Sequence, residues 1–219
     1  MNTQLTALLA FVLVFAACGG EVEPSDTVQA TVGTTSATEA PAPEATKPQA
    51  GPGSYKLAEG SEVSFEISEV LRGNRELVVG STSSVTGEVT FDSADPNAAT
   101  GGFVSVDAGS LMTNEDRRNG AIRRFILDTV DFPEITFMVT GLSGADTDTV
   151  TLEGDLTVRD ITIPVTFTMQ VLENGLGRVV LEGSAMVTRE SLDLNIPSVP
   201  FVADVSDEVT LKATLVFES

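Results

Sequence analysis

The chain has 219 residues, 42% of them hydrophobic and 5% aromatic, with no Trp, no His, one Cys and a formal net charge of −20. This length leaves room for one or two domains, and the acidic balance argues against a nucleic-acid partner, because neutralising phosphates needs a broad basic surface. The lack of His removes the commonest general base and metal ligand, and a single Cys excludes an internal disulfide.

The N-terminus has the features of an export signal. Leu5 to Ala17 form an almost wholly apolar run, which is shorter than the roughly 20 residues that span a bilayer but suits a signal-peptide core. Cys18 follows directly, and "VFAACGG" is similar to a bacterial lipobox, in which the Cys is acylated, with palmitate for example. We therefore expect residues 1–17 to be a lipoprotein signal peptide and Cys18 to anchor an exported protein to a cell-envelope membrane. An ordinary secretory signal is the alternative.

Residues 18–53 differ in composition from the rest. Thr, Ala, Pro, Glu and Gly dominate, and no apolar period is present. Such a segment buries too little surface to offset its ordering entropy, so we predict a disordered tether, whose Thr, Ser and Pro content also suits O-glycosylation. The folded domain is expected to be residues 54–219.

From Tyr55 onward, apolar and polar residues alternate with a period of two, the pattern of strands with one buried face. The strongest alternation predicts strands at 150–158, 161–171, 179–187 and 209–217. Weaker alternation predicts strands at 63–67, 85–91, 104–108 and 135–141, with a short candidate at 75–81. About eight short, regularly spaced strands indicate an all-β fold, either an antiparallel sandwich or a barrel.

Glycines on the apolar face favour a barrel with space inside. Gly87, Gly154 and Gly183 lie in mid-strand, in phase with the apolar residues. A glycine there weakens the strand and fills no volume, and an eight-stranded barrel holds either packed side chains or one small ligand. The alternative is that these glycines mark tight corners of a filled barrel.

One segment, "MTNEDRRNGAIRRFIL" at residues 112–127, breaks the strand pattern. Thr113 and Asp116 fit a capping box, so we predict a short helical insertion. Its apolar residues recur at helical spacing: Ile122, Phe125 and Ile126.

This insertion holds four of the twelve basic side chains of the chain: Arg117, Arg118, Arg123 and Arg124. At about 100° per residue, only Arg118 falls on the apolar side. We expect the other three to be solvated. Two hypotheses stay open for Arg118, namely contact with an anionic ligand headgroup at the barrel mouth or a buried pair with a barrel carboxylate.

Three pieces of residues 55–219 together resemble the YceI-like family: "VTGEVTFD", "SLMTNEDRRNGAIRR" followed by "DFPEITF", and "LEGDLTVRDITIPVTF". The resemblance implies a single antiparallel lipocalin-like barrel that binds a long polyisoprenoid chain in its apolar lumen, and it implies an exported protein.

The first functional hypothesis is a non-catalytic protein that binds an isoprenoid-type lipid or quinone, and needs no other cofactor. The residues expected to line the lumen are Phe65, Ile67, Val89, Phe91, Val106, Phe125, Phe137, Val139, Leu152, Gly154, Leu156, Val165, Phe167, Met169, Leu181 and Gly183.

Two other classes of function are alternatives to lipid binding. For an enzyme, the sequence has no nucleophile elbow, metal-ligand cluster or phosphate loop, and we expect neither catalysis nor a metal site. A structural or protein-interaction module with a filled barrel would fit the acidic surface and the tether.

Overall fold

A computed structural model describes residues 53–91, 99–144, 148–175, 177–197 and 202–219. The predicted signal peptide, the lipidation site at Cys18 and nearly all of the tether lie outside these residues. Within the ranges described, no helix combines the length and apolar character that crossing a bilayer would require.

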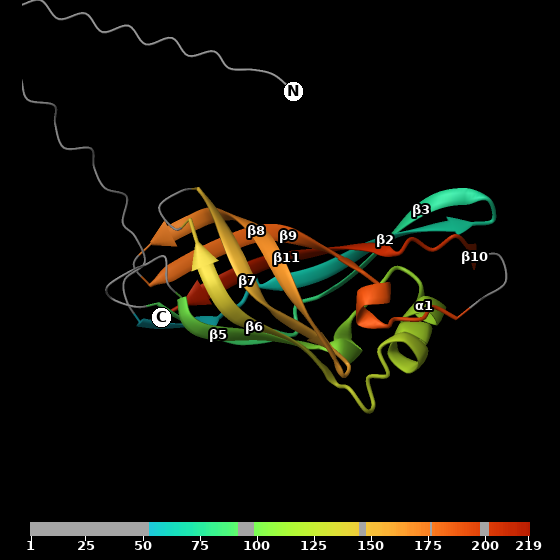
Figure 1. The fold of residues 1–219 in the computed structure, drawn as a ribbon, viewed down its shortest axis with the longest axis horizontal. Coiled ribbons are helices and arrows are strands. Elements are labelled where there is room, and N and C mark those ends of the chain that lie inside the picture. Colours follow the sequence, from blue (N-terminus) through green and yellow to red (C-terminus); the bar gives the residue numbers. More distant parts are fainter. Residues whose placement is uncertain (1–52, 92–98, 145–147, 176, 198–201) are drawn as a thin grey trace, which may run out of the picture. The chain divides into compact units, whose positions relative to one another are not determined.

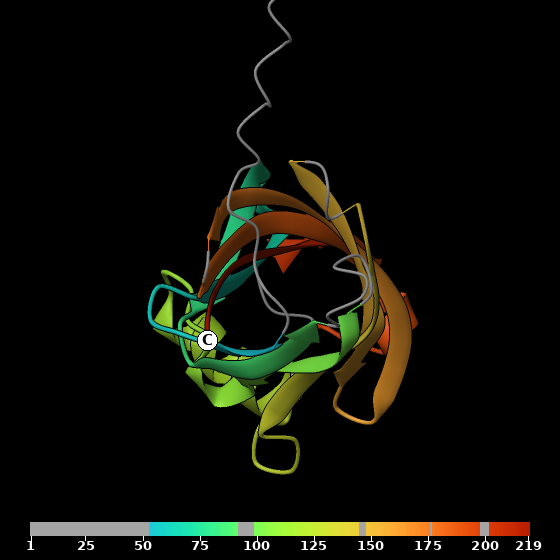
Figure 2. The same ribbon diagram turned by 90° about the vertical axis from the view of Figure 1, so that its left-hand side faces the viewer.

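Eight strands pair side by side into a closed antiparallel barrel, seen from the side in Figure 1 and from one end in Figure 2. Their order around the ring is β1 (Gly53–Leu57), β4 (Val85–Phe91), β5 (Ala99–Asp107), β6 (Glu134–Ser143), β7 (Thr149–Val158), β8 (Ile161–Gly175), β9 (Arg178–Thr188) and β11 (Glu208–Glu218). The ring closes because β1 pairs with both β4 and β11. The predicted all-β barrel of about eight strands is confirmed.

A hairpin extends one side of the barrel. Strand β2 (Glu62–Leu71) pairs with the first half of β11, and β3 (Asn74–Thr82) pairs with β2 along its length. A short strand, β10 (Val202–Ala203), pairs with the end of β2. This hairpin projects at the end of the barrel where α1 lies (Figure 1). The sequence pattern predicted β2 and β3 but not β1 or β10.

The alternation of the sequence is explained by the barrel wall. In β7, for example, every second residue from Val150 to Val158 is buried inside, while Thr151, Glu153, Asp155 and Thr157 are partly or fully exposed. Short helical turns connect strands at η1 (Ala108–Ser110) and η3 (Glu190–Leu192).

The helical insertion is present, but its start and phase differ from the prediction. Helix α1 (Asp116–Ala121) has Glu115 as its N-cap, whose carboxylate accepts the N–H of Arg118 at 2.8 Å. The expectation that Thr113 caps the helix in a capping box is therefore wrong, because Thr113 instead binds the side chain of Asn119.

The helix continues as one π-helical turn, η2 (Ile122–Ile126). The N–H of Leu127 bonds to the carbonyl of Ile122, five residues earlier. A π-helical turn holds more residues than an α-helical one, so the residues after Ile122 leave the expected phase. Ile122 is buried as predicted, whereas Phe125 is 66% exposed.

Candidate functional site

The barrel encloses a cavity of about 850 Å³ in the half nearer α1. Its inner part is lined by β6, β7, β8 and β11, and its outer part by the β2–β3 hairpin, α1, η2 and residues within 189–197 and 202–205. Ligand pockets in proteins occupy roughly 300–1,000 Å³, so the cavity is large enough for a ligand of substantial size.

Nine of the sixteen residues predicted for the lumen line this cavity: Phe65, Ile67, Val106, Phe125, Phe137, Leu152, Leu156, Phe167 and Met169. Within this wall the rings of Phe137 and Phe167 meet edge to face, with 5.4 Å between centroids. Phe125 reaches the cavity from η2 while most of its surface stays exposed, which places it at the entrance.

Six predicted residues lie elsewhere: Val89, Val139, Gly154, Val165, Leu181 and Gly183. The four with side chains belong to the packed core or lie against it. Val89, for example, pairs with the buried Tyr55, in the half of the barrel that side chains fill. The side chain of Phe91 is outside the described part of the chain.

The two predicted glycines do not leave space for a ligand. A Cβ on Gly154 would lie 2.4 Å from Cζ of Phe137, and a Cβ on Gly183 would lie 2.6 Å from Sδ of Met169. Both would also lie under 2.5 Å from a carbonyl oxygen of the neighbouring strand. The missing side chains therefore allow close packing of the wall, and the idea that glycines create the hollow is wrong.

A second part of the lining was not predicted from the sequence. An apolar set from the connection between β9 and β11 covers the entrance: Leu192, Leu194, Ile196, Pro197, Val202 and Val205. Leu192, Leu194 and Ile196 recur every two residues, but this alternation is short and ends at Pro197, so it did not predict a strand. The density of apolar residues in an otherwise loop-like segment was the available signal.

The guanidinium of Arg189 holds this connection together. Its Nε donates to the carbonyl of Ser206 at 2.8 Å, its Nη1 to that of Leu194 at 3.2 Å and its Nη2 to that of Val205 at 3.3 Å. One side chain therefore binds the backbone at Leu194 and at Val205–Ser206, and in this way Arg189 determines the shape of the entrance.

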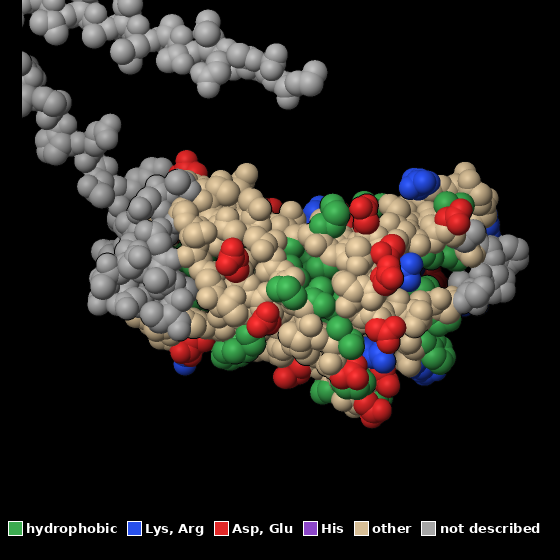
Figure 3. All heavy atoms as spheres, in the orientation of Figure 1, with side chains coloured by type: hydrophobic (Ala, Val, Ile, Leu, Met, Phe, Trp, Pro, Cys, Tyr) green, Lys and Arg blue, Asp and Glu red, His purple; other side chains and the backbone are tan. Residues whose placement is uncertain are grey.

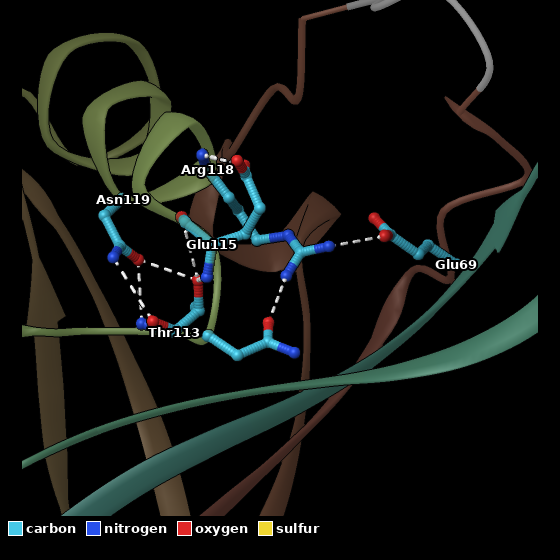
Figure 4. A network of polar contacts seen from close by, with 6 residues as sticks. Glu69, Thr113, Glu115, Arg118 and Asn119 are labelled. Atoms are coloured by element: carbon cyan, nitrogen blue, oxygen red, sulfur yellow. Dashed lines mark hydrogen bonds and ion pairs between the residues drawn. The ribbon is translucent and has the colours of Figure 1, made fainter.

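Arg118 forms an ion pair with the barrel (Figure 4). Its Nη2 lies 2.8 Å from Oε1 of Glu69 on β2, and its Nη1 donates to Oδ1 of Asn114 at 3.0 Å. Glu69 is 7% exposed. Of the two hypotheses for Arg118, the structure thus contains the pair with a barrel carboxylate, and the residue also lines the cavity.

A buried amide fixes the loop before α1. Asn119 is 1% exposed, and its Oδ1 accepts both the N–H and the hydroxyl of Thr113 at 2.7 Å, while its Nδ2 donates to the carbonyl of Thr113 at 3.2 Å (Figure 4). These bonds satisfy the buried amide and hold α1 at one position over the entrance.

The fold and the cavity define a lipocalin-like barrel domain with a hollow, apolar half. Among the described residues, no group of three His, Cys, Asp or Glu side chains could hold a metal ion. The YceI-like domain matches residues 55–217. The chain therefore belongs to the YceI-like family.

Sequence relatives cover part of the domain. The chain is 30% identical over 133 residues to a UPF0312 protein of Pseudomonas putida (strain GB-1), covering 59% of this chain and 67% of that protein. It is 28% identical over 122 residues to protein YceI of Escherichia coli O6:H1, covering 55% of this chain and 63% of that protein. The matched region thus spans less than two thirds of the Escherichia coli protein.

Solved structures share the fold. A polyisoprenoid-binding domain from Saccharophagus degradans superposes with a TM-score of 0.62 at 15% identity, covering 77% of this chain and 99% of that domain. BcnA of Burkholderia cenocepacia superposes with a TM-score of 0.58 at 24% identity, covering 71% of this chain and 95% of that protein.

Proposed function

We propose that the barrel binds the apolar chain of an isoprenoid or similar amphiphilic lipid, of polyprenyl or quinone type, without catalysing a reaction on it. The observation that carries this proposal is the cavity of about 850 Å³, whose inner wall consists of side chains such as Leu152, Phe167 and Met169. Apolar surface gains roughly 25 cal/mol per Å² when it leaves water, so a long hydrocarbon chain would bind there through burial alone. The polyisoprenoid-binding domain of Saccharophagus degradans, which has the same fold, supports this assignment.

The proposal includes a lipid anchor on Cys18. Several acyl chains, at about 0.8 kcal/mol per buried CH₂, would hold the protein firmly on a membrane. The tether would then keep the barrel close to a source of lipid, as a carrier, a store or a sensor would need. Export as a cell-envelope lipoprotein is tested by fractionation, where wild-type protein should sediment with membranes and Cys18→Ala should not.

The experiment that tests binding is extraction of the purified protein with organic solvent, followed by mass spectrometry. We expect a prenyl lipid or quinone near one equivalent per chain. Delipidated protein should show a raised melting temperature when a polyprenol is added, since a ligand that binds only the native state stabilises it. An empty extract together with an unchanged melting temperature would refute lipid binding and favour a structural or protein-interaction module.

A further inference from the structure

The cavity ends inside the barrel at a layer of apolar side chains, which we call its floor. On the strands β5, β6, β7, β8 and β11, the floor consists of the last lining residue on the way to the filled half of the barrel. These residues are Val104, Phe137, Leu152, Met169 and Leu215.

Packed core lies directly beneath the floor. On β6, β7, β8 and β11, the residue one step deeper in the same phase belongs to the buried cluster or packs against it, and it does not line the cavity. These deeper residues are Val139, Val150, Val171 and Phe217. A ligand that reaches the floor therefore meets close-packed side chains, which leave no space for a longer chain.

Met169 is the residue of the floor that the structure holds most tightly. It is 0% exposed, and its register partners are Val150 on β7 and Gly183 on β9. A Cβ on Gly183 would lie 2.6 Å from Sδ of Met169, so the Met169 side chain occupies the position that a side chain at Gly183 would need. An unbranched thioether fills such an irregular gap well. Met169 thus covers Gly183 and closes the cavity on the side of β9.

The depth of the cavity gives a length for the chain that it can hold. Strand β11 lines it from Val209 to Leu215, a stretch of about 20 Å at the usual rise of a strand. An isoprene unit has one main-chain bond more than an amino acid residue, so it extends by about 4.5 Å. A chain that lies along β11 would therefore reach the floor with about four isoprene units.

Units beyond this length would emerge at the entrance. Acidic and basic side chains gather at the α1 end of the face drawn in Figure 3. The emerging units would remain in contact with water and charged groups there, and they would gain little of the free energy of apolar burial.

We propose that Met169 sets the length of the isoprenoid chain that the cavity buries, and that this limit is about four isoprene units. This inference rests on the proposed function, because it assigns a chain length to the lipid that the barrel holds. Chains up to the limit bind more tightly with every unit added, and longer chains gain nothing further.

The test compares farnesol, geranylgeraniol and geranylfarnesol, each one isoprene unit longer than the last, in competition for delipidated protein with the bound lipid quantified by mass spectrometry. Each buried CH₂ favours binding about fourfold. Geranylgeraniol should therefore bind at least about tenfold more tightly than farnesol, whereas geranylfarnesol should gain less than about threefold over geranylgeraniol.

Two variants move the floor in opposite directions. Met169→Ala lowers it, and geranylfarnesol should then bind about tenfold more tightly than geranylgeraniol. Leu152→Phe raises it, and geranylgeraniol should lose its advantage over farnesol. Val171→Ala is the matched control, because Val171 has the same phase on the same strand as Met169 and does not line the cavity. This control should keep the wild-type limit.

The outcomes separate the two proposals. A tenfold gain with every added unit in the wild-type protein would overturn the length limit and leave lipid binding intact. An equal shift in Met169→Ala and Val171→Ala would show that Met169 does not set the limit. Should Met169→Ala fail to fold, Leu152→Phe decides, since an unchanged limit in that variant would refute the floor. Failure of every one of these alcohols to bind would overturn the proposed function itself.

Discussion

Arg118 on α1 and Glu69 on β2 join the helical insertion to the barrel through an ion pair of 2.8 Å. The two residues are 49 positions apart in the chain, and Glu69 is almost fully buried. An unpaired charge at such a site is costly, so the pair holds α1 over the entrance of the cavity.

Removing Arg118 should therefore destabilise the protein. We expect Arg118→Met to lower the free energy of unfolding by about 1–3 kcal/mol, because Glu69 keeps its charge without a partner. Urea denaturation measures this loss, and the double variant Glu69→Leu/Arg118→Met should recover part of it. Arg124→Met, at an exposed position, should change stability by less than about 0.5 kcal/mol. Equal losses in the two single variants would contradict the role of the pair.

Asn119 should be more sensitive to truncation than its exposed neighbour Asn114. Asn119→Ala removes the partner of the N–H, hydroxyl and carbonyl of Thr113, and we expect a loss of about 2–3 kcal/mol, the cost of leaving buried polar groups unsatisfied. Asn114→Ala removes one exposed bond to Arg118 and should cost under about 1 kcal/mol. Thermal unfolding of both variants gives the comparison, and the reverse order would refute it.

Glycines inside the barrel wall and in the helix should respond oppositely to Ala. Gly154→Ala places a Cβ 2.4 Å from the ring of Phe137 and from a backbone carbonyl, which should cost about 1–3 kcal/mol through overpacking. In α1, a Cβ on Gly120 meets nothing within 4 Å. Gly120→Ala should therefore stabilise by about 0.5–1 kcal/mol, since Ala favours the helix. A stabilising Gly154→Ala would mean that the wall holds spare space after all.

A bulky residue on the cavity wall should exclude the ligand without unfolding the barrel. Ala213 lines the cavity from β11, and Ala213→Phe would project a ring into it. We expect the delipidated variant to melt at or above the wild-type temperature, because the ring fills empty space, and the lipid that co-purifies to be largely lost. Thr214→Phe, on the other face of the same strand, is the control and should keep its lipid. Retention of lipid by Ala213→Phe would place the ligand outside this cavity.

The strands were predictable because alternation is a local property. Each run such as 150–158 shows one apolar face whatever it packs against, and the structure has a strand at every predicted position. The presence of the helical insertion was also predictable. Its phase was not, because the π-helical turn at Ile122–Ile126 leaves no mark in the spacing of apolar residues.

The site depended on contacts between distant segments. Alternation assigns Val89 and Phe167 equally to the interior, but only packing decides that the first is in the filled half and the second on the hollow. Helical phase alone pointed Arg118 toward the barrel, whereas only the packing of α1 beside β2 placed Glu69 opposite it. The sequence of each strand thus determines which side chains face inward. The volume between them exists only once the strands close into a ring.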